Sequence, residues 1–323
     1  MTDQRSQDRA ELAAALKKKP RPREAVIVGS LFVAGFVSIA VTLGILFELG
    51  RESLLFFQDP NVNLGEFLGS TRWAPSAGDF GIWPLVLGTS LIAFIALLVA
   101  IPMGLASAIY LSEYAPERVR SIFKPILEVL VGIPTVVYGF FALTFMTPLL
   151  RSIIGEDVVQ FFNVASAGLV VGILITPLIS SLSEDAMRSV PDALRQAAYA
   201  LGASKMEVSL RIVVPAALSG IGAGIVVAMS RAVGETMVVA LAAGAAPRNF
   251  TIGEDPLFSY ILNPFLPGEA MTGYIVRIAS GDLSYATLDY NSIFAVGLTL
   301  FFITLGLNIL SRWLVARYRQ EYG

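Results

Sequence analysis

Two charged residues interrupt a long apolar stretch of the sequence. Residues 212–247 contain no charge other than Arg231 and Glu235. A charge near the centre of a bilayer costs at least about 2.5–3.5 kcal/mol, so such residues face the protein interior or water and mark functional sites. On a helix, a spacing of four residues places both side chains on one face. The pattern predicts a paired guanidinium and carboxylate that line a solute pathway. A structural ion pair that only orients the helix is the alternative.

The chemistry of this pair suits an oxyanion that must pass rather than stay. The Arg231 guanidinium offers a rigid fork of donors that matches phosphate oxygens and keeps its charge. The Glu235 carboxylate competes for that fork and repels the anion, so binding remains reversible. Further candidates for polar lining, each with ordinary helix packing as its alternative, are Ser230, Thr236, Thr135 and Tyr138.

A second informative segment lies just before this stretch. Pro191 suits the first turn of a helix, and Gly202 suits the position just past a helix end. Ser204 followed by Glu207 forms the capping-box pattern that begins another helix. The segment therefore predicts a helix, a tight glycine turn and a second helix. Small residues leave room around this turn for the surface of another protein, and they are Ala197, Ala198, Ala200 and Ala203.

The composition excludes most enzyme chemistry. The 323 residues include no cysteine and no histidine, which excludes disulfides, Cys-based metal sites, thiol nucleophiles and the usual general base near neutral pH. The sequence has no G-x-x-x-x-G-K-[ST] phosphate-binding loop, so we expect this chain not to hydrolyse ATP and to hold no metal or cofactor of its own.

Long charge-free stretches must position these residues. The chain is 55% hydrophobic and only 15% charged, which is typical of an all-α membrane protein. We predict six transmembrane helices at about 25–47, 80–112, 127–150, 160–183, 214–246 and 290–312. The predicted divisions are a cytoplasmic arm 1–24, a transmembrane domain 25–315 with a coupling loop 184–213, and a cytoplasmic tail 316–323.

The distribution of Lys and Arg gives the orientation. Seventeen of the 23 basic residues fall on the side of both termini and five on the other side, so both termini are expected in the cytoplasm. The long outer connection, about Arg248–Asp289, carries aromatic and apolar residues. We predict a folded external cap there, with a surface-lying amphipathic segment as the alternative.

The turn segment resembles the "EAA" signature of ATP-binding cassette (ABC) importer permeases, E-A-A-x3-G-x9-I-x-L-P. The matching residues are Gln196-Ala197-Ala198, Gly202 and Ile212-Val213-Val214-Pro215, with Gln196 and Val214 as departures. The resemblance implies the type I ABC importer permease fold and a coupling helix that sits in a cleft of a cytoplasmic ATPase. It assigns ATPase coupling to Gln196, Ala197, Ala198, Gly202, Ala203 and Ser204. A chance helical hairpin is the alternative.

The segment Arg231–Met237 resembles the R-A-[IL]-G-E-T-M stretch of permeases from phosphate-specific transport systems. Pro125–Glu128 with Ile133–Gly139 is similar to their third span, and Ala270–Gly273 to the outer loop of their C-type subunit. The resemblance implies a permease subunit of an ATP-driven, high-affinity phosphate importer that forms half of the pathway. It also implies that transport needs Arg231 and Glu235.

The resemblance further implies the partners. They are a second, A-type permease subunit, two copies of a cytoplasmic ATPase that uses ATP and Mg, an external phosphate-binding protein and membrane lipid, with no nucleic acid. The expected location is the bacterial plasma (inner) membrane. Two alternatives stay open: an ABC permease for another oxyanion or small solute, and a proton-coupled secondary phosphate carrier.

Overall fold

The computed structural model describes residues 22–251, 260–281 and 287–318. The predicted arm 1–24 and tail 316–323 therefore lie largely outside the described residues, as do parts of the outer connection. The chain separates into two units, Met1–Leu49 and Gly50–Gly323. The first consists, where described, of the beginning of α2 (Pro22–Phe57), a helix that carries no charge on any face between residues 25 and 47. Such a helix suits a lipid environment.

The second unit is built around two long helices in close contact, α4 (Trp83–Ile109) and α8 (Val164–Arg188). Glycines bring their backbones together. A Cβ added to Gly168 would lie 2.7 Å from the Ile95 Cβ, and one added to Gly172 would lie 2.8 Å from the Ala96 carbonyl oxygen. Small residues at helix interfaces are a common basis for packing in membranes, where the lipid provides no hydrophobic driving force.

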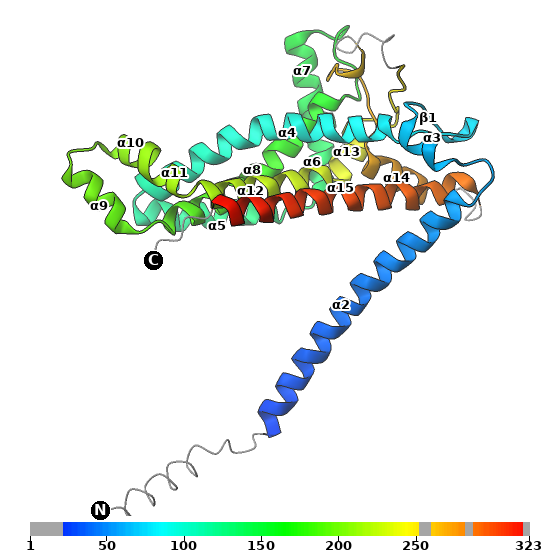
Figure 1. The fold of residues 1–323 in the computed structure, drawn as a ribbon. Coiled ribbons are helices and arrows are strands. Elements are labelled where there is room, and N and C mark those ends of the chain that lie inside the picture. Colours follow the sequence, from blue (N-terminus) through cyan, green and yellow to red (C-terminus); the bar gives the residue numbers. More distant parts are fainter. Residues whose placement is uncertain (1–21, 252–259, 282–286, 319–323) are drawn as a thin grey trace, which may run out of the picture. The chain divides into compact units, whose positions relative to one another are not determined.

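Two further helices pack beside this pair, α12 (Leu218–Val233) against α8 and α15 (Leu288–Tyr318) against α12, as Figure 1 shows. In α12, Gly220 and Gly224 form a G-x-x-x-G motif that faces α8. Cβ atoms at these positions would lie 2.6 Å from the Ala186 Cβ and 3.0 Å from the Leu182 Cβ. This motif therefore joins two helices of the same chain.

The third span is shorter than predicted. An amphipathic helix, α5 (Glu117–Val131), ends before Pro134, and the spanning segment follows as α6 (Thr135–Phe141), a π-helical turn (142–146) and α7 (Thr147–Ile154). The predicted boundaries 127–150 are thus wrong at their start. Proline lacks an N–H and disfavours helical backbone at the residue before it, so the helix stops at Gly132.

The fifth span is bent and broken. The segment Lys205–Ala216, which contains α10 (Lys205–Glu207), a π-helical turn and α11 (Val214–Ala216), meets α12 at 70°. Beyond α12 the helix is interrupted before α13 (Met237–Ala242). A continuous span over 214–246 is therefore not formed. The described residues contain five helices long and apolar enough to cross a membrane, or six if the bent pair counts as one span.

The first span, predicted at 25–47, ends later than predicted, because its helix continues to Phe57. The other predicted boundaries are closer to the structure. The second span continues α4 with a π-helical turn, Tyr110–Tyr114. The fourth span, predicted at 160–183, is α8 and continues to Arg188, so the predicted coupling loop begins after Arg188 rather than at residue 184. The sixth span, predicted at 290–312, lies within α15.

The end of the second unit that was predicted to face outward is folded. After α3 (Leu64–Gly69), the strands β1 (Trp73–Ala74) and β2 (Asp79–Phe80) form a small antiparallel hairpin, with Trp73 opposite Phe80. The Trp73 ring packs edge-on against Tyr274 of α14 (Met271–Ala279), with centroids 5.0 Å apart. The helix α14 lies against α4, α13 and α15. It is therefore part of the helical bundle rather than a cap over it.

One buried arginine holds the described part of the outer connection 248–289 together. The Arg248 guanidinium donates to the carbonyl oxygens of Pro267 (2.7 Å), Leu266 (2.6 Å), Ile261 (2.9 Å) and Tyr260 (3.2 Å). These bonds satisfy a cation that is only 7% exposed. They hold the backbone at residues 260–261 and at residues 266–267 together through one side chain.

Candidate functional site

The predicted pathway residues lie where the fifth span is broken. Helix α12 ends at Val233, and Gly234 to Thr236 are not helical before α13 begins. A residue distant in sequence satisfies the open backbone, because the Thr272 hydroxyl of α14 donates to the Glu235 carbonyl oxygen at 2.7 Å. Non-helical backbone at membrane depth is tolerated where protein or a water-filled cavity surrounds it.

Arg231 stands in the last turn of α12 with its side chain exposed on the surface of this chain. Within the described part of the chain, its guanidinium has neither an ion-pair nor a hydrogen-bond partner. The predicted pair with Glu235 is therefore not formed. The reason is local: the helix ends between the two residues, so their spacing of four no longer places them on one face.

Glu235 has the opposite environment. The residue is only 3% exposed, and its Oε1 atom is buried with no hydrogen-bond partner in the described structure. The Oγ atom of Ser230 is also buried and unpartnered, whereas Thr236 Oγ1 donates to the Gly234 carbonyl oxygen at 3.2 Å. A buried polar atom without a partner costs about 1–3 kcal/mol, and more if charged. Such a cost is typical of functional sites.

The face of α12 that carries Arg231 is not the one that packs in the bundle. Gly224 and Ala228 are buried in the helix bundle, whereas Val227 is 42% exposed. Val227 lies one turn before Arg231, and Met237, just after the break, is 41% exposed. Arg231 therefore lies on a largely apolar surface that points away from the core of this chain.

The candidates from the third span, Thr135 and Tyr138, lie on α6, which is a neighbour of α13. Helix α6 packs on α13 through Gly139, where a Cβ would lie 2.6 Å from the Leu241 Cδ1 and 3.1 Å from the Met237 carbonyl oxygen. Thr135 and Tyr138 are half-buried. The Tyr138 hydroxyl donates to the Leu130 carbonyl oxygen at 3.2 Å. Tyr138 thus bridges the break between α5 and α6 and does not bond to Arg231 or Glu235.

The coupling segment has the predicted shape. Helix α9 (Asp192–Ala200) ends in a turn at Gly202, whose φ of +85° favours glycine. Ser204 and Glu207 form the predicted capping box: Glu207 Oε2 accepts from the Ser204 N–H at 2.9 Å, and the Ser204 Oγ accepts from the Glu207 N–H at 3.3 Å. The sequence thus predicted this hairpin correctly. We call residues 192–207 the coupling hairpin.

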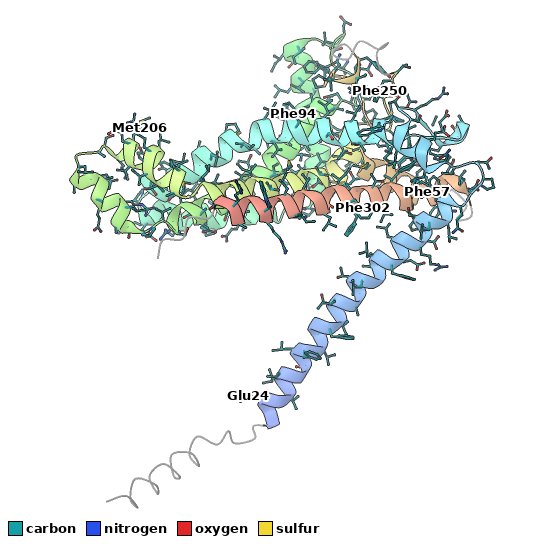
Figure 2. The ribbon with its side chains drawn as sticks, viewed as in Figure 1. Glu24, Phe57, Phe94, Met206, Phe250 and Phe302 are labelled. Atoms are coloured by element: carbon teal, nitrogen blue, oxygen red, sulfur yellow. The ribbon has the colours of Figure 1, made fainter. Side chains whose placement is uncertain are left out.

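The tip of the coupling hairpin exposes apolar side chains. Leu201 is 89% exposed and Met206 62%, and Figure 2 shows Met206 on the outer side of the hairpin. Of the predicted coupling residues, Gln196, Ala197, Gly202 and Ser204 are exposed, Ala203 is half-buried and Ala198 is buried in the second unit. The hairpin and the β1–α3 region lie at opposite ends of the helix bundle (Figure 1).

Sequence reasoning missed an ion cluster at the hairpin end of the bundle. Glu184 of α8, 1% exposed, lies 2.7 Å from the Arg120 Nε and 2.8 Å from the Lys124 Nζ of α5. The Arg120 contact is an ion pair without an aligned hydrogen bond. Burial acts to lower the pKa of Lys124, but hydrogen bonds to Asp185 and Glu184 raise it overall. The available signal was that Glu184 and Asp185 directly follow the charge-free stretch 158–183.

The described residues hold no cluster of three or more His, Cys, Asp or Glu side chains that could bind a metal ion. What the site offers is an exposed guanidinium, a buried carboxylate and a protruding hairpin. Such an arrangement can bind an anion reversibly and make contact with other proteins, but it contains no nucleophile activated by a base.

Comparisons with known proteins agree with this arrangement. Residues 100–320 match the family described as "Binding-protein-dependent transport system inner membrane component". The probable ABC transporter permease protein YqgH of Bacillus subtilis strain 168 is 31% identical over 283 residues, 87% of each chain. The phosphate transport system permease protein PstC of Xylella fastidiosa strain Temecula1 is 32% identical over 308 residues, 89% of each chain.

The fold has solved counterparts. The crystal structure of a bacterial ABC transporter involved in the import of the acidic polysaccharide alginate contains a chain that matches with a TM-score of 0.60. The match covers 93% of this chain and 100% of that chain at 16% identity, which supports the fold alone. The chain therefore belongs to the family of binding-protein-dependent transport system inner membrane components and is a multi-pass inner-membrane permease with the type I ABC importer fold.

Proposed function

We propose that this chain is the permease subunit of an ATP-driven, high-affinity phosphate importer and forms half of its translocation pathway. The observation that carries the proposal is Arg231, an exposed guanidinium without a partner in the described structure, at the break of a membrane span. Relatives named as phosphate transport system permeases, 30–32% identical over 80–89% of the chain, support the choice of phosphate.

In this proposal Arg231 contacts the passing phosphate. A guanidinium binds phosphate through charge-assisted hydrogen bonds that keep their strength where water is scarce. Glu235, in the same break, places a carboxylate beside the route and weakens the hold on the anion. Ser230, Thr236, Thr135 and Tyr138 are proposed as weaker polar contacts. Tyr138 is the least suited because its hydroxyl is already bonded to Leu130.

The partners follow from the family and from the two exposed features. The coupling hairpin docks on a cytoplasmic ATPase, which uses ATP and Mg, and two copies of it serve the complex. The face of α12 around Arg231 meets a second, A-type permease subunit, and an external phosphate-binding protein delivers the solute. The relatives are themselves permease proteins, so we assign ATP hydrolysis to the ATPase subunit and none to this chain.

The test substitutes Arg231→Gln in the assembled complex, with phosphate uptake and ATP hydrolysis measured in vesicles. We expect uptake to fall by about 10-fold or more, the size of one charge-assisted hydrogen bond, while assembly and hydrolysis persist. The matched control is Arg118→Gln, which removes an exposed arginine outside the break. Normal uptake by Arg231→Gln would refute the proposed contact. Strong competition by sulfate or molybdate would instead favour a general oxyanion importer.

A further inference from the structure

One arginine of the coupling hairpin has all five of its N–H donors engaged. Arg195 Nε donates to Glu113 Oε2 at 3.4 Å, and NH2 donates to Glu113 Oε1 at 3.0 Å and to the Met187 carbonyl oxygen at 2.9 Å. NH1 donates to the Val190 carbonyl oxygen at 2.6 Å and to Asp192 Oδ1 at 3.2 Å. A planar fork with every donor fixed has little freedom to rotate.

The acceptors belong to different elements. Glu113 lies in the π-helical turn that continues span α4, Met187 lies in the last turn of α8, and Val190 lies in the link between α8 and the hairpin. Arg195 itself is in α9. The guanidinium thus joins the coupling hairpin directly to the ends of two spans.

The contact is largely shielded from water. The Glu113 side chain is 5% exposed and that of Arg195 is 15% exposed. The Ser112 hydroxyl also donates to Glu113 Oε1, at 2.9 Å, which helps to fix the carboxylate. A shielded pair is screened much less by salt than a surface pair, and removing one partner leaves an uncompensated charge.

The same elements also contribute residues to an apolar cluster. Ala198 of the hairpin packs with Ala108 of α4, Met187 of α8 and Val208 just beyond the hairpin, and all four are buried. Lys205 of α10 lies over the ring of Tyr114, 5.0 Å from its centroid. Apolar contacts resist separation but are not directional, because they depend on the area buried and not on bond angles. The bidentate pair and the carbonyl contacts supply the direction.

We infer that Arg195 is the positioning residue that transmits movement of the coupling hairpin to spans α4 and α8. The inference rests on the proposed function, in which the hairpin docks on an ATPase. When the ATPase moves the Gly202 turn, α9 is displaced, and the fixed fork of Arg195 carries the ends of both spans with it. Without the bonds of the Arg195 guanidinium, the hairpin moves within the apolar cluster, and the ends of α4 and α8 do not follow it.

The test separates hydrolysis from transport. Arg195→Lys keeps the charge but replaces five fixed donors with a flexible ammonium, and Glu113→Gln keeps the shape of the acceptor without its charge. In the full complex in vesicles, we expect both variants to assemble and hydrolyse ATP. The phosphate transported per ATP hydrolysed should fall by about 5-fold or more, the lower end of typical coupling between two sites.

The matched control is Arg211→Lys. Arg211 follows the same hairpin but is 79% exposed, and its contact with Glu207 is 3.9 Å long, so the transport ratio should not change. An unchanged ratio in Arg195→Lys and Glu113→Gln would overturn the inference. A parallel fall of uptake and hydrolysis, or of the amount of assembled complex, would also overturn it, because the role would then be structural only.

A third variant tests the underlying docking. Gly202→Trp places a large side chain at a position with φ of +85° and open space around it. It should abolish both ATP hydrolysis by the docked ATPase and phosphate uptake. Arg195→Lys, by contrast, should lower uptake and leave hydrolysis in place. Normal uptake by Gly202→Trp would reject the docking proposal itself and with it the inference.

Discussion

Arg231 and Glu235 show how a short change in backbone alters the role of a side chain. In an unbroken helix the two would neutralise each other, and little attraction for an anion would remain. Because α12 ends at Val233, the guanidinium stays exposed while the carboxylate is buried. The break therefore makes Arg231 available to a solute, which an intrahelical pair would not.

Thr272 supports this arrangement from another helix. Thr272→Val removes the donor to the Glu235 carbonyl oxygen while keeping the side-chain shape. We expect a loss of about 1–3 kcal/mol in the free energy of unfolding, the cost of an unsatisfied buried acceptor. Thr272→Ser, which keeps the hydroxyl, should lose less, and uptake should follow the same order. Unfolding in detergent and uptake in vesicles are the measurements.

The control for this prediction is Thr144→Val. Thr144 is exposed and donates only to the Phe140 carbonyl oxygen one turn earlier in the chain, so its replacement should have little effect. Equal stability of Thr272→Val and the natural protein would show that the contact does not hold the break.

The residues of the proposed site were chosen from local sequence patterns, and their role in transport stays a prediction. Arg231 was identified because a charge in an apolar span is rare, and the Gly202 turn because its capping residues are local. Thr272 and Arg195 were missed as functional residues because their partners are far away in sequence: Glu235 is 37 residues from Thr272, and Glu113 is 82 residues from Arg195. Local patterns contain no information about such pairs.

At the scale of elements, the contact between α4 and α8 depends on glycines. Gly168→Ala would place a methyl group 2.7 Å from the Ile95 Cβ, closer than ordinary van der Waals contact. We expect a loss of about 1–3 kcal/mol in the free energy of unfolding, the usual effect of overpacking. Thermal unfolding of the purified chain in detergent measures it.

The control is Gly222→Ala in α12, where an added Cβ meets nothing within 4 Å. Alanine is favoured over glycine in a helix by up to about 1 kcal/mol, so this variant should be as stable as the natural protein or slightly more stable. If both variants behaved alike, close backbone approach would not explain the glycine at position 168.

The elements also show where a hydropathy pattern fails. Residues 127–150 and 214–246 appear as continuous spans because they carry no charge apart from Glu128, Arg231 and Glu235. Pro134 was a visible stop signal for the first break, since proline disfavours helical backbone before it. The second break has only Gly234 as a local signal, and it is stabilised by α14, which the sequence places in an outer connection. The five spanning helices of the described residues were otherwise predicted within a few residues at most ends.

For the whole molecule, the orientation with both termini in the cytoplasm stays a prediction from the distribution of Lys and Arg. The structure adds that the coupling hairpin and the β1–α3 region occupy opposite ends of the second unit. An importer needs this separation, because the ATPase acts on one side of the membrane and the solute arrives on the other.

The end of the second unit that carries β1 and β2 should respond to pH through Glu269. Burial raises the pKa of this carboxyl, and the hydrogen bond from the Arg277 Nε, 2.7 Å long, offsets part of the effect. When the pKa of a carboxyl group is higher in the folded than in the unfolded protein, its contribution to the stability of the fold is fully present below the unfolded pKa. That contribution is lost as the pH rises through the folded pKa. Stability should therefore increase as the pH falls from neutral towards the unfolded pKa of Glu269.

The measurement compares unfolding midpoints of the natural protein and Glu269→Gln between about pH 8 and about pH 5, where linkage through a raised carboxyl pKa acts. The difference between the two should shift in favour of the natural protein as the pH falls. A difference that stays constant over this range, or shifts the other way, would contradict the raised pKa.

The four carbonyl contacts of Arg248 have a practical consequence. Exported domains often close irregular loops with disulfides or bound metals, and both can be lost to a reductant or a chelator. Here a single guanidinium performs that closure, and the 323 residues include no thiol at all. A reductant or a chelator therefore has no bond to attack in this closure. Any cysteine introduced for labelling would also be the sole thiol in the chain.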